Sequence, residues 1–307
     1  MNHTTTTKTK ISDRMSLSRY ASVSVYLTTV LAVLGAVLQS AVLITVYEGD
    51  KGVYVAGDLF GHAVGIFLLV SAVLVFVTNL FLPRMAEQKL LSIPPCCNVT
   101  AFLSAMCGCS AVAASGLALT EKGATEGAMG VVVKLMLLLS VPVIFYFILM
   151  ALNHKHVTLL TVLSFTPVLW LALMLMRLYF DRTSSINDPM KILFQLSLSA
   201  VMLAYMAEAR IRVGKKGVRF LFAISSLAVV LAITSSISMF IFRLTGGVLS
   251  ASSSMVAVTE LLFALYLLSR LYAYRHFIGR NSEVTERETT LEEKITAEID
   301  GDGTAEL

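Results

Sequence analysis

Eight apolar segments, each long enough to cross a lipid bilayer as a helix, occupy most of this chain. They lie at residues 21–47, 60–82, 99–119, 129–152, 157–178, 190–209, 218–242 and 251–274. A helix needs about 20 apolar residues to span a hydrocarbon core of ~30 Å. Barrel strands instead alternate apolar and polar residues over about ten residues. Because the runs are continuous, the sequence predicts an all-α fold: a polytopic transmembrane helix bundle with eight spans.

The composition leaves little room for a separate soluble domain. Of the 307 residues, 56% are hydrophobic and 14% are charged, whereas soluble domains contain about 25% charged residues. We expect a cytosolic N-terminal tail at 1–20, an eight-helix transmembrane domain at 21–280 and an acidic tail at 281–307. This last segment holds nine Asp and Glu residues, a pattern typical of a solvated, disordered extension.

Basic residues are concentrated in alternate gaps between the apolar segments. The two terminal segments and the second, fourth and sixth gaps hold 17 of the 24 Lys and Arg residues. Positive charge favours the cytosolic side of a membrane, and an even number of spans places both termini on one side. We therefore predict cytosolic termini. The compact layout with short tails is typical of a bacterial, multi-pass protein of the plasma (cell) membrane.

Glu260 is the most informative single residue, because it lies well inside the last apolar segment. A charged side chain at the centre of a membrane helix costs about 2.5–3.5 kcal/mol, so Glu260 is expected to face the bundle interior. Lys134 in the fourth span lies toward the same membrane face and is predicted to be its partner. Glu260 is interpreted as a coupling or binding residue. The alternatives are a buried structural pair, or a Lys134 side chain that extends to the outer surface.

Further polar residues are predicted near the outer face, where they would form a vestibule with Glu260 and Lys134. They are His62, Arg177, Asp181 and Arg243. Positive charge exceeds negative charge in this set, which favours a small anionic or zwitterionic solute. Arg177 and Asp181 have a competing explanation, since their i,i+4 spacing suits an ordinary ion pair at a helix end.

Local patterns predict several structural details. Asp188 followed by Pro189 is typical of a helix start. Pro142 and Pro167 predict kinks inside the fourth and fifth spans. Glu208 and Arg212 are spaced i,i+4 and predict a local ion pair.

The two halves of the chain also suggest a tandem duplication. A shift of 126 residues lays the first four spans over the last four and places Lys134 on Glu260. The hypothesis is a 4+4 arrangement of parallel repeats.

We predict no metal site, no cofactor and no catalytic residue. Cys107 and Cys109 point about 200° apart on a helix, and Cys96 and Cys97 with the two histidines of a later gap match no usual zinc spacing. The chain contains no phosphate-binding loop, His-Glu-x-x-His motif or nucleophile elbow. Enzymatic chemistry is therefore left open, but no residue pattern requires it.

The sequence favours a small-solute transporter or permease in which Glu260 is the coupling or binding residue. The alternative is a non-transporting membrane component: an assembly partner, sensor or scaffold. Such a component would bind a protein through its acidic tail or through the basic loop at 210–219. The composition requires the lipid bilayer as a partner, and the basic loop suits anionic lipid rather than nucleic acid.

Overall fold

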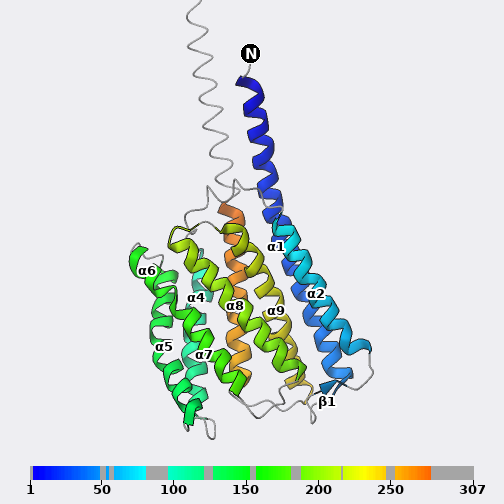
Figure 1. Cartoon of the computed structure of the whole chain (residues 1–307), viewed down its shortest axis with the longest axis vertical. Helices are drawn as coiled ribbons and strands as arrows, with labels where there is room; N and C mark the ends of the chain where they lie inside the picture. Colours follow the sequence, from blue (N-terminus) through cyan, green and yellow to red (C-terminus); the bar gives the residue numbers. More distant parts are fainter. Residues whose placement is uncertain are drawn as a thin grey trace, which may run out of the picture.

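The structure, a computed structural model, describes residues 3–48, 53–54, 59–80, 96–120, 127–152, 157–180, 188–215, 217–246 and 253–277, with only the backbone for residues 3–18, 48, 80 and 157. The elements are α1 (His3–Thr45), β1 (Tyr47–Glu48), β2 (Val53–Tyr54), α2 (Leu59–Leu80), α4 (Asn98–Leu119), α5 (Gly127–Ala151), α6 (Val157–Leu163), α7 (Thr166–Phe180), α8 (Pro189–Arg212) and α9 (Val218–Leu244). A last helix follows at Ser253–Phe277. We call it the central helix, and it is drawn in orange in Figure 1.

Eight helices in the described residues are long and apolar enough to cross a membrane, which confirms the predicted bundle of apolar helices. They are Arg19–Thr45, Leu59–Asn79, Asn98–Leu119, Gly127–Ala151, Thr158–Phe180, Pro189–Arg212, Val218–Leu244 and Ser253–Phe277. Eight such helices indicate an integral membrane protein. The structure adds one small β element, the antiparallel pair of β1 and β2, in which Tyr47 lies opposite Tyr54.

The two ends of the bundle differ in character. α1 begins, and the central helix ends, at the end that also carries the turn between α8 and α9 (Figure 1). The last turn of α8 holds the exposed Arg210 and the following turn holds the exposed Lys215, so we call this the basic end. β1 lies at the opposite end, which we call the hairpin end. With an even number of spans, the start of the first helix and the end of the last helix must lie on the same side of the bundle.

The central helix contacts helices from both halves of the chain. Neighbouring helices pack in the order α2, α1, α9, α8, α7, α5 and α4. The central helix bonds to three of them along its length. Thr259 donates to the Ser110 carbonyl of α4, Arg270 to Glu208 of α8, and Arg275 to Ser22 of α1. The polar side chains of Thr259 and Arg270 on the central helix, both 2% exposed, therefore lie in the bundle interior.

Two predicted details of helix geometry are confirmed. The Asp188 side chain accepts a hydrogen bond from the Met190 amide at 2.9 Å and caps α8, with Pro189 in the first turn. The fifth span breaks between α6 and α7, where Pro167 has no amide hydrogen for the Leu163 carbonyl. The Thr166 hydroxyl donates to that carbonyl instead, at 2.8 Å. Pro142 causes no such break, because α5 continues through it as one helix.

Candidate functional site

The carboxyl group of Glu260 is completely buried and is bonded to serine hydroxyls. Its side chain is 0% exposed. Ser197 of α8 donates to Oε1, and two serines of α9 donate to Oε2: Ser235 at 3.1 Å and Ser236 at 2.9 Å. This group, which we call the Glu260 cluster, joins the central helix to α8 and α9. Each hydroxyl can both donate and accept, so the cluster can bond to either protonation state of the carboxyl group.

The expected partnership of Glu260 with Lys134 is not found. Lys134 lies on α5 with an exposed side chain, and no ion pair joins it to Glu260. The face of α5 that points into the bundle carries other residues, such as Val133 and Met136, both 0% exposed. Since Lys134 is next to Val133 on the helix, it points away from that face. The prediction used only the depth of Lys134 in the membrane. The direction of a side chain depends instead on its position in the helical period, which depth does not give.

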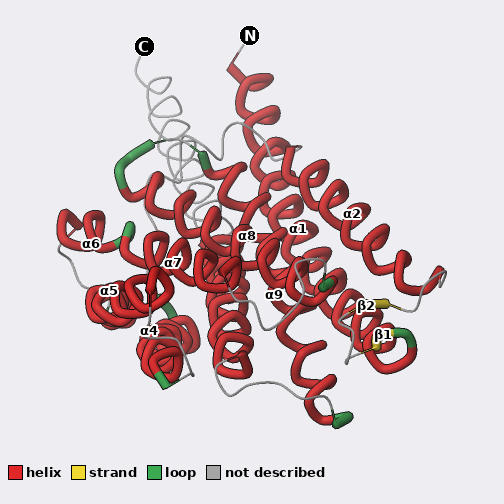
Figure 2. The backbone as a smooth tube through the Cα atoms, turned by 60° about the horizontal axis from the view of Figure 1, so that its bottom comes forward, coloured by secondary structure: helices red, strands yellow, loops and turns green. Residues whose placement is uncertain are grey.

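The other predicted vestibule residues are spread over the bundle. His62 is exposed in the first turn of α2, and Arg177 is partly buried in the last turn of α7. Arg243 is exposed at the end of α9 and donates to Ser254. Asp181 lies outside the described residues. α2 and α5 lie at opposite sides of the bundle in both views (Figure 1 and Figure 2), so the structure does not bring His62 and Lys134 together.

A second buried cluster of charge lies nearer the basic end. Glu208 of α8 binds two guanidinium groups through the same oxygen, Oε1. Arg212 lies 3.3 Å away one turn later on α8, and Arg270 of the central helix lies 3.5 Å away. The predicted pair of Glu208 and Arg212 is confirmed. However, it is buried, with exposed fractions of 3% and 9%, rather than a surface ion pair. We call these three residues the arginine cluster.

Aromatic rings and sulfur atoms surround the arginine cluster. The Arg212 guanidinium lies 5.6 Å from the ring centre of Tyr146, and Arg270 lies 5.4 Å from that of Tyr274. Arg212 also donates to the sulfur of Met150 at 2.7 Å. Cation–π contacts of this kind gain strength when they are shielded from water. The surroundings therefore stabilise the positive charges.

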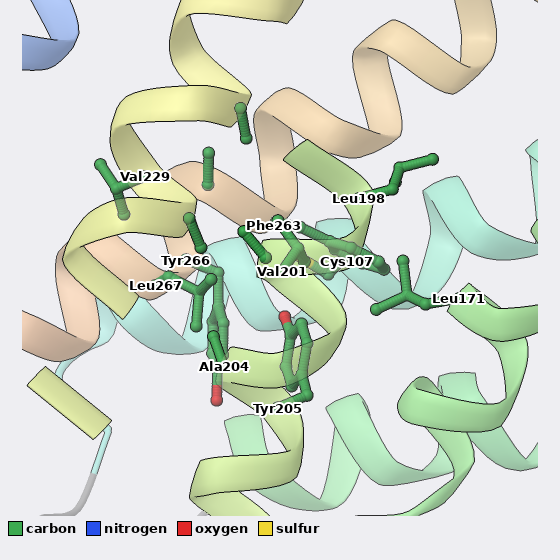
Figure 3. Close-up of a cluster of buried hydrophobic side chains, with 14 of the residues drawn as sticks. Cys107, Leu171, Leu198, Val201, Ala204, Tyr205, Val229, Phe263, Tyr266 and Leu267 are labelled. Carbon is green, nitrogen blue, oxygen red and sulfur yellow. The ribbon is translucent and has the colours of Figure 1, made fainter. Parts of the chain in front are cut away.

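A layer of aromatic side chains separates the two clusters along the central helix. We define this aromatic layer as Phe147, Trp170, Tyr205, Phe263 and Tyr266, all of which are buried. Phe263 touches Phe147, Trp170 and Tyr205, with ring centres 5.6–6.0 Å apart. Figure 3 shows Phe263 and Tyr266 among the aliphatic side chains of Val201 and Leu267. In this conformation, close apolar packing lies between the Glu260 cluster and the arginine cluster.

Sequence reasoning missed the interior position of Arg270 and the serine ligands of Glu260. Arg270 is followed by Arg275 and Arg280, a basic series that by itself indicates the cytosolic end of a span. One signal was available: Arg270 is followed by Leu271, Tyr272 and Ala273, an apolar context that places it inside the helix. The hydroxyl-rich stretch of α9 could have suggested Ser235 and Ser236 as partners for a buried carboxyl group.

A polar contact outside the spans fixes the hairpin end. The Tyr47 hydroxyl donates to Asp188 Oδ1 at 3.2 Å and so joins β1 to the start of α8. Burial raises the pKa of the Asp188 carboxyl above its usual range, and the hydrogen bonds from Met190 and Tyr47 act in the opposite direction. Burial, together with the nearby charge of Asp188, also raises the pKa of Tyr47.

Comparisons with known proteins give no functional assignment. No protein-family model matches the chain, no curated protein resembles it in sequence, and no solved structure matches its fold. Within the described residues, no three His, Cys, Asp or Glu side chains come together as a metal site would require. Function therefore has to be inferred from the buried polar clusters themselves.

Proposed function

We propose that this protein is a cation-coupled transporter of small solutes, in which Glu260 takes up and releases the coupling cation. A proton is the simplest such cation. The observation that supports this proposal is the environment of the carboxyl group: it is completely buried, it is bonded to three serines, and no described Lys or Arg forms an ion pair with it.

Because Glu260 is buried without a basic partner, its carboxyl group is not stable as a bare anion. An ionised carboxylate in an apolar interior is costly unless a cation accompanies it, whereas a neutral acid needs only hydrogen bonds. The group is therefore expected to carry a proton or to bind a cation whenever it is enclosed as observed. A carboxyl group that exchanges this cation when water reaches it has the property that a coupling residue requires.

A purely structural role explains the Glu260 cluster less well. Glutamine has the same shape and forms comparable hydrogen bonds to Ser197, Ser235 and Ser236 without the cost of an ionisable group. Within the membrane, ionisable side chains are rare and are commonly found on ion or substrate paths. Glutamate at position 260 is therefore better explained by its ability to change charge.

The aromatic layer supports the same proposal. Transporters place their binding groups near the middle of the membrane and open them to one side at a time. Glu260 lies seven residues after Ser253, which is roughly 10 Å from the start of the central helix at 1.5 Å per residue. The aromatic layer blocks the way from there to the basic end, as expected for a conformation closed on that side.

The test is solute uptake by proteoliposomes under an inward proton gradient. Radiolabelled monocarboxylates and zwitterionic amino acids are the first solutes to supply, in line with the positive excess predicted from the sequence. We expect wild type to accumulate at least one of them. Glu260→Gln should abolish accumulation but retain exchange of the same solute between equal pools, because exchange needs no net cation movement.

Glu260→Asp is the matched variant, because it keeps a titratable carboxyl group on a shorter side chain. It should retain part of the gradient-driven uptake. A Glu260→Gln protein that accumulates solute as wild type does would refute the coupling role. If no solute is taken up, the non-transporting alternative becomes the better account. Its own prediction is that truncation after Arg280 removes a co-purifying protein.

A further inference from the structure

We infer that the basic end of the bundle contains a binding site for a small oxyanion, a carboxylate or phosphate group, formed by Arg212 and Tyr266 beside Glu208 and Arg270. Arg270 follows Glu260 by ten residues, which places this site roughly 15 Å further along the central helix at 1.5 Å per residue. The inference concerns binding alone and does not depend on the proposed transport.

One donor of Arg212, Nε, has no acceptor among the described residues. One terminal nitrogen, Nη2, donates to Glu208 Oε1 at 3.3 Å and to the Met150 sulfur at 2.7 Å. A thioether is a weak acceptor, and a guanidinium group has five N–H donors. The Nε atom of Arg212 is buried and has no hydrogen-bond partner. A buried donor of this kind requires an acceptor that the described side chains do not supply.

Tyr266 provides a second unsatisfied donor close by. Its hydroxyl oxygen is buried and has no hydrogen-bond partner among the described residues. Tyr266 precedes Arg270 by four residues on the central helix, so both side chains lie on the same face of that helix. The donors of Tyr266 and Arg212 thus reach one cluster from two helices.

The chemistry of these donors fits an oxyanion. The planar guanidinium fork matches the paired oxygens of a carboxylate or phosphate, and hydrogen bonds between such charged groups are stronger than neutral ones. Glu208 supplies one oxygen to two guanidinium groups, so a second anionic acceptor would relieve this sharing. A buried water molecule could accept some of these hydrogen bonds, but it would bring no charge.

The burial of the cluster favours a free solute over a membrane lipid as the source of the oxyanion. The side chains of Glu208 and Arg270 are 3% exposed and that of Arg212 is 9% exposed. Lipid headgroups remain near the membrane surface, where the exposed Arg210 and Lys215 lie. A small anion that enters between helices can reach donors that a headgroup attached to its acyl chains reaches less easily.

The test is thermal unfolding of the purified full-length protein, delipidated into an uncharged detergent. Sodium acetate, sodium benzoate and sodium phosphate are titrated at constant ionic strength, with sodium chloride as the balancing salt. We expect a saturable rise in Tm with at least one of the oxyanions. Parallel samples receive phosphatidylglycerol or phosphatidylcholine in place of the salts. A rise with free oxyanions assigns the site to a solute, and a rise with phosphatidylglycerol alone assigns it to a headgroup phosphate.

Matched variants show whether the effect arises at the proposed site. Arg212→Lys keeps the charge but removes the planar fork and Nε, and should weaken binding at least tenfold. Tyr266→Phe removes one hydroxyl from an unchanged ring and should weaken it severalfold. Arg210→Lys, an exposed position two residues before Arg212, should bind as wild type does. No saturable rise with any probe, or equal binding by wild type, Arg212→Lys and Tyr266→Phe, would overturn the inference.

Discussion

Arg270 of the central helix and Glu208 of α8 form a buried ion pair, with 3.5 Å between Nη2 and Oε1 and exposed fractions of 3% on both sides. The two residues are 62 positions apart in the sequence. Because Glu208 Oε1 also accepts from Arg212, this one carboxylate balances two guanidinium groups at the point where α8 meets the central helix. The pair therefore fixes the packing of these helices near the basic end.

Removal of the Glu208 charge should destabilise the protein strongly. Loss of one partner of a buried ion pair leaves the other charge uncompensated and typically costs about 3–5 kcal/mol. We expect Glu208→Gln to lose stability in that range, measured by reversible unfolding in mixed micelles. Arg210→Gln, at an exposed site on the same turn of α8, should change stability by less than about 0.5 kcal/mol. Equal stability of the two variants would contradict a structural role for the arginine cluster.

The close approach of α1 and α9 at Gly35 gives a second prediction. A methyl group on Gly35 would lie 2.3 Å from the Thr234 hydroxyl oxygen and 3.3 Å from a ring carbon of Phe67. Overpacking of this kind costs about 1–3 kcal/mol, so Gly35→Ala should lower the free energy of unfolding by that amount. Gly65→Ala on α2, where no atom lies within 4 Å of the added methyl group, is the matched control.

A double mutant identifies the cause of the Gly35 effect. Thr234→Ala removes the hydroxyl that the new methyl group would meet, so Gly35→Ala should cost at least about 1 kcal/mol less in that background. The same cost in both backgrounds would show that contact with Thr234 does not limit the approach of the two helices.

The pH dependence of stability should report on Asp188. Because burial raises its pKa, the folded protein holds this proton more tightly than the unfolded chain. The resulting stability is fully present below the unfolded pKa of about 3.9 and is lost as pH rises through the folded pKa. Asp188→Asn keeps a capping oxygen and cannot ionise. The Tm of wild type relative to Asp188→Asn should therefore fall as pH rises above the unfolded pKa.

Tyr47 provides a check on the sign of this effect. Its hydroxyl donates to the Asp188 carboxylate at 3.2 Å and so favours the ionised form. In a Tyr47→Phe background, the fall in relative Tm with rising pH should become steeper. A Tm difference that is constant with pH, or that grows in favour of wild type as pH rises, would contradict the assignment.

The sequence was sufficient for the features that depend on neighbouring residues. Apolar length predicted the spans, the Asp188-Pro189 pair predicted the start of α8, and Pro167 predicted the break between α6 and α7. Each follows from local physics: the length of a helix that crosses hydrocarbon, a side-chain cap, and a missing amide donor. The confirmed i,i+4 pair of Glu208 and Arg212 belongs to the same class.

Features that depend on which helices meet could not be predicted in the same way. Uniformly apolar helices give little indication of which face turns inward. Lys134 was predicted to contact Glu260 because both lie toward the same membrane face, but a similar depth does not bring two side chains together. The partners of Glu260 are serines of α8 and α9, which apolar periodicity does not distinguish from other small residues. The burial of Arg270 likewise arises from the surrounding helices. The tandem duplication, the cytosolic termini and the ligand roles of His62, Arg177, Asp181 and Arg243 stay predictions.

The most direct test of the coupling role is infrared spectroscopy of the protein reconstituted in lipid, because it needs no known substrate. A protonated carboxyl group has its own C=O stretching band, which shifts in heavy water if the proton exchanges. We expect a band that is absent from Glu260→Gln, shifts in heavy water and loses intensity as pH rises. A wild-type spectrum that matches Glu260→Gln at every pH, or a Glu260 band unaffected by pH and heavy water, would contradict the account.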